Sequence, residues 1–131
     1  MSRENVAVGR RMIEGFNEHA SWWDALDENI EWHARSDEPD AGIHHGRQAV
    51  RRYIGGWEDM FPGYRIELTG AIVDLGDQVI LPAQLVGAAR TTGITVREPY
   101  VFLLAISNGL ITLTREFGRE AEALKAAGIS E

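Results

Sequence analysis

Residues 99–118 read PYVFLLAISNGLITLTREFG, which is two strand-forming runs joined by Asn108-Gly109. Both residues of this pair tolerate the positive φ angles of a type I′ turn, so the stretch predicts a β-hairpin. The first run, residues 100–106, is apolar at every position. A strand with one face in water would alternate, so we expect both faces of this strand to be covered.

The second run of the hairpin alternates and contains a carboxylate, Glu116. Alternation would place one set on the polar face, Thr112, Thr114 and Glu116, and another on the apolar face, Ile111, Leu113 and Phe117. If the polar face lines a cavity, burial would raise the pKa of Glu116 toward a value useful to a general acid or base. The alternative is a surface glutamate paired with a nearby arginine.

The bulk composition describes an ordinary globular protein with one domain, residues 1–131. Its net charge of −7 would repel phosphate backbones, so we expect no nucleic-acid partner. The absence of cysteine excludes disulfides and fits a cytoplasmic location. The first residues carry no apolar signal core, and residues 100–106 are far too few to span a bilayer, so we expect no membrane association.

Helical spacing is clearest over residues 46–61. One face of this helix would carry Val50, Tyr53, Ile54, Trp57 and Phe61. Gly55 and Gly56 lie within the helix, which suggests close packing or a bend there. Pro62-Gly63 would end it.

The remaining segments complete an α+β order. We expect an N-terminal helix from residue 3, a short helix around Trp22, Trp23 and Leu26, strands over residues 29–33, 64–75 and 78–89, and a helix over residues 119–127. Pro82 within the third of these strands marks a bulge or an edge.

This order predicts helices on one face of a curved antiparallel sheet. The other face, with Val79, Val101 and Leu103, would need separate cover. We therefore predict a homodimer through the sheet face.

Motifs over nearly the whole chain carry a family resemblance. They are ENV at residues 4–6, RMIEGFN at 11–17, NIEWH at 29–33, HGRQAVR at 45–51, FPGYRI at 61–66, NGLI at 108–111 and TREF at 114–117. The chain thus resembles the NTF2-like superfamily and, within it, the SnoaL-like proteins related to ketosteroid isomerase. The resemblance implies a cystatin-like cone, in which a curved sheet wraps a pocket closed by N-terminal helices and members commonly dimerise through the sheet.

The resemblance leaves the activity open, because families on this scaffold include isomerases, polyketide cyclases, epoxide hydrolases, dehydratases and non-catalytic binding subunits. The pair Arg115-Glu116 looks like the Arg-Asp near the end of the last strand in SnoaL-like cyclases and limonene-epoxide hydrolases, where the Asp is an acid/base. Trp32 and Ala34 look like the matches to a Tyr and an Asn of the epoxide hydrolases. That departure counts against epoxide hydrolysis.

We therefore predict Glu116 as a catalytic proton carrier, with His33 as a second one. Strand alternation lets only one of Trp32 and His33 face the pocket. The candidate ligand-binding residues are Trp32, Tyr53, Trp57, Gln84, Tyr100 and Thr114. For the aromatic ones among them, ordinary core packing is the alternative.

Other chemistries find little support in the sequence. His44 and His45 with Asp37, Glu38 and Asp40 suggest a metal only weakly, because adjacent histidines project differently and no fixed-spacing ligand motif is present. Asp37 or Asp40 is a weak match to the base of the ketosteroid isomerases. We predict no metal and no cofactor.

Two hypotheses remain. The first is a cofactor-free general acid/base enzyme of isomerase, polyketide cyclase or dehydratase type, acting on a compact apolar or polyketide-like molecule. The second is a non-catalytic ligand-binding or dimeric assembly module. An interior filled by the protein's own aromatic side chains would favour the second.

Overall fold

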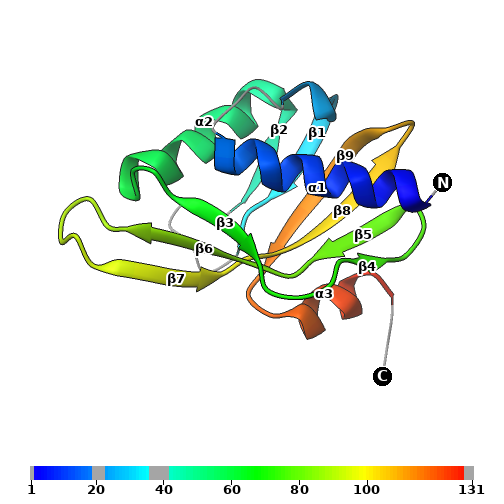
Figure 1. Cartoon of the computed structure of the whole chain (residues 1–131). Helices are drawn as coiled ribbons and strands as arrows, with labels where there is room; N and C mark the ends of the chain where they lie inside the picture. Colours follow the sequence, from blue (N-terminus) through cyan, green and yellow to red (C-terminus); the bar gives the residue numbers. More distant parts are fainter. Residues whose placement is uncertain (1, 19–22, 36–41, 129–131) are drawn as a thin grey trace.

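The computed structural model describes residues 2–18, 23–35 and 42–128 (Figure 1). Its helices are α1 (Ser2–Glu18), the 3₁₀ helix η1 (Trp23–Ala25), α2 (Gly46–Met60) and α3 (Glu120–Ala126). Its strands are β1 (Leu26–His33), β2 (Ile43–His45), β3 (Arg65–Leu68), β4 (Val73–Asp74), β5 (Gln78–Leu81), β6 (Ala83–Ala88), β7 (Thr95–Pro99), β8 (Val101–Ser107) and β9 (Leu110–Phe117).

The strands form two sheets. The larger has the order β2-β1-β9-β8-β5-β4, and the smaller has the order β3-β6-β7. We expected only antiparallel pairs, but β1 and β9 run parallel, with Trp32 beside Thr114. A parallel pair needs a long crossover connection. Here the whole chain between β1 and β9 supplies it, and local turn signals do not reveal such a pairing.

The proline within the predicted strand over residues 78–89 divides it. β5 ends at Leu81 and pairs with β8, whereas β6 begins at Ala83 and pairs with β3 and β7. Pro82 therefore lies where the chain leaves the larger sheet for the smaller one. Proline has no N–H to donate to a ladder, so the transition occurs there at little cost.

The predicted hairpin is confirmed, because Asn108 and Gly109 have φ angles of 53° and 77° between β8 and β9. The face assignment of Ile111 is wrong. Ile106 lies opposite Ile111 and Ala105 opposite Leu113, which leaves Thr112 as a bulge. The extra residue shifts the alternation by one position. Ile111 therefore lies on the inner face with Thr114 and Glu116.

The inner face of the larger sheet packs against α1 and α2 around one large core. The buried face of α2 is as predicted, with Val50, Tyr53, Ile54 and Trp57. Of the two alternatives for the paired glycines of α2, close packing or a bend, close packing is wrong. A Cβ added at Gly55 would meet nothing within 4 Å.

Helix α3 covers the part of the outer face of the larger sheet that β5, β8 and β9 form. Ile80, Val101 and Leu103 form a second core with Ala123 of that helix, so both faces of β8 are covered, as predicted. Val79 instead belongs to the inner core, contrary to our expectation. Since α3 supplies cover that we had assigned to a second subunit, the homodimer stays a prediction.

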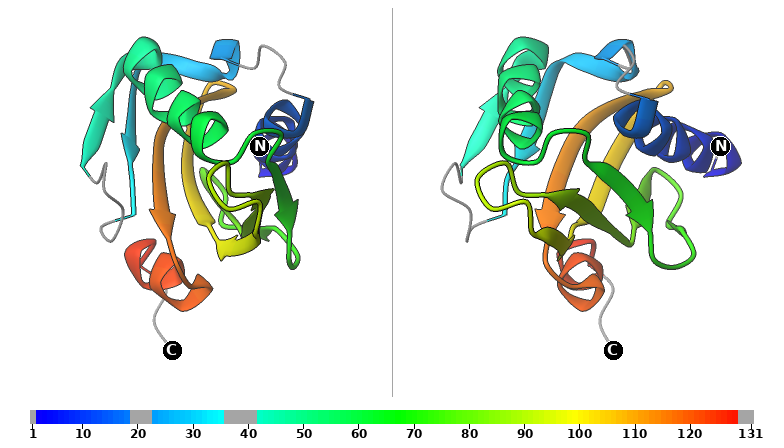
Figure 2. Two further views of the ribbon diagram at one scale, coloured as in Figure 1. Left: turned by 90° about the vertical axis from the view of Figure 1, so that its left-hand side faces the viewer. Right: turned by 60° about the vertical axis from the view of Figure 1, so that its left-hand side comes forward.

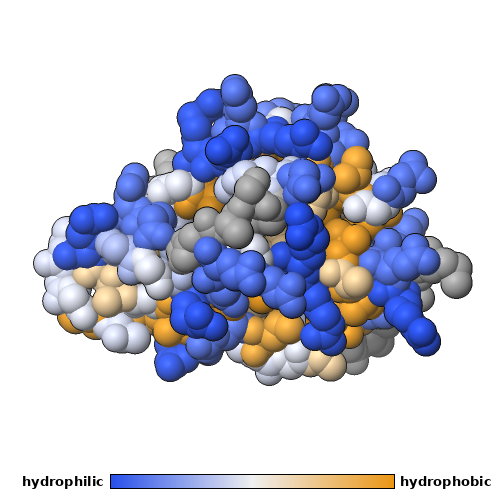
Figure 3. All heavy atoms as spheres, turned by 45° about the horizontal axis from the view of Figure 1, so that its top comes forward, coloured by the Kyte–Doolittle hydropathy of each residue, from blue (hydrophilic) through white to orange (hydrophobic). Residues whose placement is uncertain are grey.

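The face that carries α1 and α2 shows mainly hydrophilic side chains in the space-filling view, with hydrophobic ones in narrower areas between them (Figure 3). Within the described residues, no helix combines the length and apolar character needed to cross a membrane.

Candidate functional site

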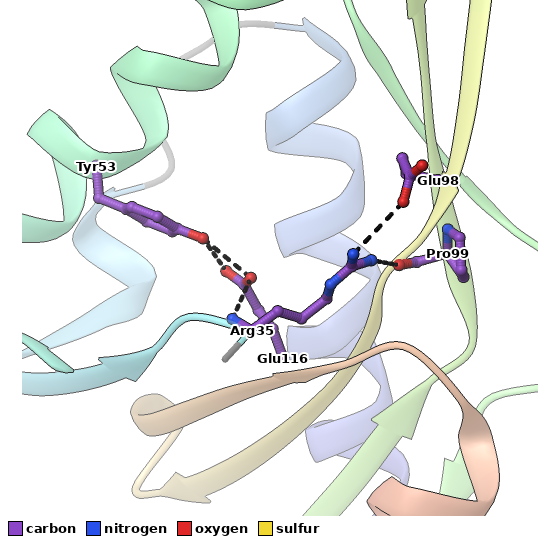
Figure 4. Close-up of polar contacts among 5 residues, drawn as sticks. All are labelled: Arg35, Tyr53, Glu98, Pro99 and Glu116. Carbon is purple, nitrogen blue, oxygen red and sulfur yellow. Dashed lines mark hydrogen bonds and ion pairs between the residues drawn. The ribbon is translucent and has the colours of Figure 1, made fainter. Parts of the chain in front are cut away.

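Glu116 on β9 is a buried carboxylate that accepts several hydrogen bonds (Figure 4). The residue is 4% exposed. Trp32 donates from Nε1 to Oε2 at 2.5 Å, and the Tyr53 hydroxyl lies 2.9 Å from both carboxylate oxygens. The backbone N–H of Arg35 donates to Oε1 at 3.2 Å. Side chains from β1 and α2 thus converge on one carboxylate of β9.

Local structure explains each donor. Trp32 lies on the inner side of β1, which pairs directly with β9. Tyr53 belongs to the apolar stripe of α2, and its ring stacks on His44 with centroids 4.4 Å apart. Hydrogen bonds donated to a carboxylate favour its charged form, whereas burial disfavours it. Such a carboxylate is positioned to take a proton from a molecule bound beside it.

Arg35 was not among the predicted site residues. Its side chain extends away from Glu116, donates to the Pro99 carbonyl at 2.5 Å and approaches a Glu98 carboxylate oxygen at 3.4 Å (Figure 4). The guanidinium also lies 4.9 Å from the Tyr100 ring centroid. Arg35 therefore ties the end of β1 to the end of β7. Its position in a predicted loop carried no signal of this role.

The predicted aromatic residues lie together in the interior. Trp57 packs against Tyr100, Tyr53 and Phe16, with ring centroids 5.0, 5.5 and 5.6 Å apart. Trp32 packs edge-on against Phe16 at 6.4 Å. These contacts match the core-packing alternative while also forming an aromatic wall beside the carboxylate.

Two polar atoms in this interior lack a partner among the described residues. They are Nε1 of Trp57 and Oγ1 of Thr114. Thr114 is fully buried and lies two residues before Glu116 on the inner face of β9. Buried polar atoms are nearly always hydrogen-bonded in proteins, so these two are candidates to bind water or a ligand.

The structure does not bring two of the predicted site residues to Glu116. His33 faces the outer side of β1, where its Nε2 lies 3.2 Å from Glu31, and its side chain is 29% exposed. Trp32, rather than His33, is therefore the inward residue of that pair. Gln84 on β6 donates to Glu67 at 3.2 Å, on the opposite side of its strand from the buried Leu85.

A groove of about 790 Å³ opens beside this site. It is lined from the ends of β1 and β9 and from the start of α3; Figure 2 shows β9 running to α3. It is lined by His33, Ala34, Arg35, Pro99, Arg115, Glu116, Phe117, Gly118, Arg119 and Glu122. Its volume lies in the range typical of small-molecule sites.

In the part of the chain that the structure describes, no three metal-ligating side chains gather. The candidate acids Asp37, Glu38 and Asp40 lie outside the described residues.

Residues 9–114 match the family model of the SnoaL-like domain. The chain belongs to this family. None of the curated proteins matches the chain. The fold prediction is confirmed as an NTF2-like, cystatin-like cone whose curved sheet is mixed rather than wholly antiparallel.

Three solved structures illustrate the similarity. A protein described as a SnoaL-like polyketide cyclase from Jannaschia sp. CCS1 has a TM-score of 0.77 at 17% identity, covering 99% of this chain and 95% of its own. A ketosteroid isomerase-like protein from Catenulispora acidiphila, in complex with trimethylamine, has a TM-score of 0.73 at 12% identity, covering 94% and 93%. TerC, co-crystallised with polyporic acid, has a TM-score of 0.77 at 13% identity, covering 93% and 96%. At these identities the likeness concerns the fold alone.

Proposed function

We propose that this SnoaL-like protein binds a compact, mostly apolar molecule beside Glu116 and moves a proton with that carboxylate, without a cofactor. The observation that carries the proposal is the buried Glu116 carboxylate, which Trp32 and Tyr53 hold by hydrogen bonds within an aromatic wall. Removal of a proton next to a carbonyl is the step that isomerisation and aldol-type cyclisation share. Dehydration of a hydroxy ketone can begin in the same way.

Trp57 Nε1 and Thr114 Oγ1 suit the second requirement of this chemistry, which is stabilisation of the carbonyl oxygen of the substrate. A carbonyl oxygen gains negative charge as the neighbouring carbon loses its proton. Trp57 Nε1–H and the Thr114 hydroxyl, both buried and without a partner among the described residues, would donate to that oxygen. The ligand would thereby give hydrogen-bond partners to two atoms that have none within the described residues.

For the ligand class we propose the kind of molecule named for two structures that share the fold. One is described as a polyketide cyclase, and another was crystallised with polyporic acid. We therefore favour a polyketide-like molecule with a ketone group.

The second candidate function is a ligand-binding or dimeric assembly module without chemistry. The ring-to-ring contacts of Phe16, Trp57 and Tyr100 favour it, because they occupy much of the cone interior.

A nitrobenzisoxazole tests the proposal without knowledge of the natural substrate. Transfer of its ring C–H proton to Glu116 breaks the N–O bond and releases a coloured cyanonitrophenolate. We expect Glu116→Gln to lower kcat/KM at least ~100-fold, the lower end of what a positioned base contributes. The matched control Glu14→Gln replaces an exposed carboxylate on α1 and should retain full activity. Equal rates for wild type and Glu116→Gln would contradict the proposal. Quenching of tryptophan fluorescence by the probe without turnover would favour the binding module.

A further inference from the structure

The groove at the ends of β1 and β9 holds an arginine, Arg115, that has no counter-ion among the described residues. Arg115 lies on the outer face of β9, beside His33 of β1 and on the side away from the inner aromatic wall. Its guanidinium lies 5.1 Å from the Phe117 ring centroid. Like Ala34, Phe117 lines the same groove.

Arg115 differs from the other half-buried arginines of the described chain. Arg35 binds the Pro99 carbonyl and Glu98, and Arg47 donates to the Leu26 carbonyl at 2.8 Å. Arg115 makes no hydrogen bond or ion pair with any described residue. A charge that is partly removed from water is normally compensated by a partner.

The carboxylates around this groove do not supply that partner. Glu31 pairs with His33, and Glu116 is turned toward its donors on the inner side. Glu122 lines the groove but makes no ion pair with Arg115 or with the exposed Arg119, which also lines it. Within residues 2–18, 23–35 and 42–128, the guanidinium groups of Arg115 and Arg119 therefore have no ion-pair partner, in a protein whose net charge is −7.

We infer that this groove binds a small organic carboxylate with a flat apolar body. The planar guanidinium of Arg115 matches a carboxylate in a two-bond arrangement, and Arg119 adds a second positive charge. Phe117, Ala34 and Pro99 supply apolar surface for the body of the molecule. This inference goes beyond the proposed function, since it concerns the outer face and holds whether or not Glu116 moves a proton.

Calorimetric titration with naphthoate and with naphthamide tests this inference, because the two probes share a ring system and differ in charge. We expect the full chain to bind naphthoate at least tenfold more tightly than naphthamide. Arg115→Gln should weaken naphthoate binding tenfold or more and leave naphthamide binding unchanged. Arg119→Gln should weaken naphthoate less, and added salt should weaken naphthoate alone.

The matched control is Arg10→Gln, which removes an exposed arginine on α1 that has no ion pair among the described residues. It should bind both probes as the wild type does. Equal affinity for the two probes, equal losses in Arg115→Gln and Arg10→Gln, or no naphthoate binding at about 1 mM would each overturn the inference. If Arg115→Gln does not fold, Arg119→Gln and the salt dependence still decide it.

Discussion

Two adjacent residues of β9, Glu116 and Arg115, carry charges that lie in different surroundings. Glu116 points inward, is almost completely buried, and accepts hydrogen bonds from β1, α2 and the backbone beyond β1. Arg115 points outward, is half-buried, and contacts the Phe117 ring but no carboxylate of the described residues. One strand therefore carries a hydrogen-bonded charge on its inner face and, on its outer face, a charge without a counter-ion in the part of the chain that the structure describes.

The two faces of β9 differ in how completely the described residues surround a charge with partners. Hydrogen bonds to a buried charge must be complete, since a missing partner costs the full desolvation of the group. The inner side meets this demand at Glu116 with side chains from distant parts of the sequence. On the outer side, Arg115 has no ion-pair partner among the described residues, in agreement with the inferred carboxylate ligand.

The largest expected effect concerns the donors of the inner charge. Tyr53→Phe removes the hydroxyl that reaches both oxygens of Glu116. We expect the free energy of unfolding to fall by about 1.5–3 kcal/mol, the usual value of a hydrogen bond to a charged group. Urea unfolding measures it. A loss below about 0.5 kcal/mol, the range of ordinary surface substitutions, would show that the inner charge does not depend on this donor.

The inner core also predicts a pH dependence through Tyr64. Burial raises the pKa of Tyr64, and the negative charge of Glu58 adds to the effect. The neutral phenol is thus favoured in the folded protein, so its contribution to stability is complete below about pH 10, the ordinary tyrosine pKa. It is lost above that pH, at up to about 1.4 kcal/mol per pH unit.

Urea unfolding at several alkaline pH values should reveal this loss, and Tyr64→Phe should make the decline shallower. An identical decline in the variant would assign the alkaline sensitivity to other groups.

A smaller effect on stability is expected from removing the hydroxyl group of Thr114, compared with that of Thr112 at the bulge. Thr114 Oγ1 has no partner among the described residues, whereas Thr112 Oγ1 donates to the Ala105 carbonyl at 3.3 Å. Thr114→Val should therefore stabilise the free protein by about 1 kcal/mol, because valine has nearly the same shape as threonine and carries no polar atom to bury. Thr112→Val should not stabilise it. Destabilisation by Thr114→Val would mean that a bound water already satisfies the hydroxyl.

Local patterns predicted the parts of the fold that depend on neighbouring residues. The turn at Asn108-Gly109 follows from two residues that accept positive φ angles, and the buried face of α2 follows from helical spacing. Glu116 was predicted to share a face with Thr114, and the structure places both on the inner side. The motifs that resemble SnoaL-like proteins predicted the cone-shaped fold.

Features that depend on packing between distant segments could not be predicted in this way. The bulge at Thr112 leaves no mark in the alternation of the strand, and it reverses the face of Ile111. Alternation required Trp32 and His33 to differ but did not say which one points inward. Arg35 binds Glu116 through its backbone N–H and reaches the end of β7 with its side chain. No pattern of residues in the sequence predicts either contact.

The smallest expected effect is on the outer charge. Arg115→Gln removes the contact between the guanidinium and the Phe117 ring, which is worth about 0.5–1 kcal/mol at an exposed site. It also removes a half-buried charge that has no counter-ion among the described residues, so the two contributions oppose each other. We expect the free energy of unfolding to change by less than about 0.5 kcal/mol. Urea unfolding of this variant and of Tyr53→Phe, measured under the same conditions, checks this expectation.

A loss as large as that of Tyr53→Phe would mean that Arg115 stabilises the fold, and the contrast between the two faces of β9 would then fail. If stability is instead preserved, weaker naphthoate binding by Arg115→Gln reports the groove itself and not an unfolded protein.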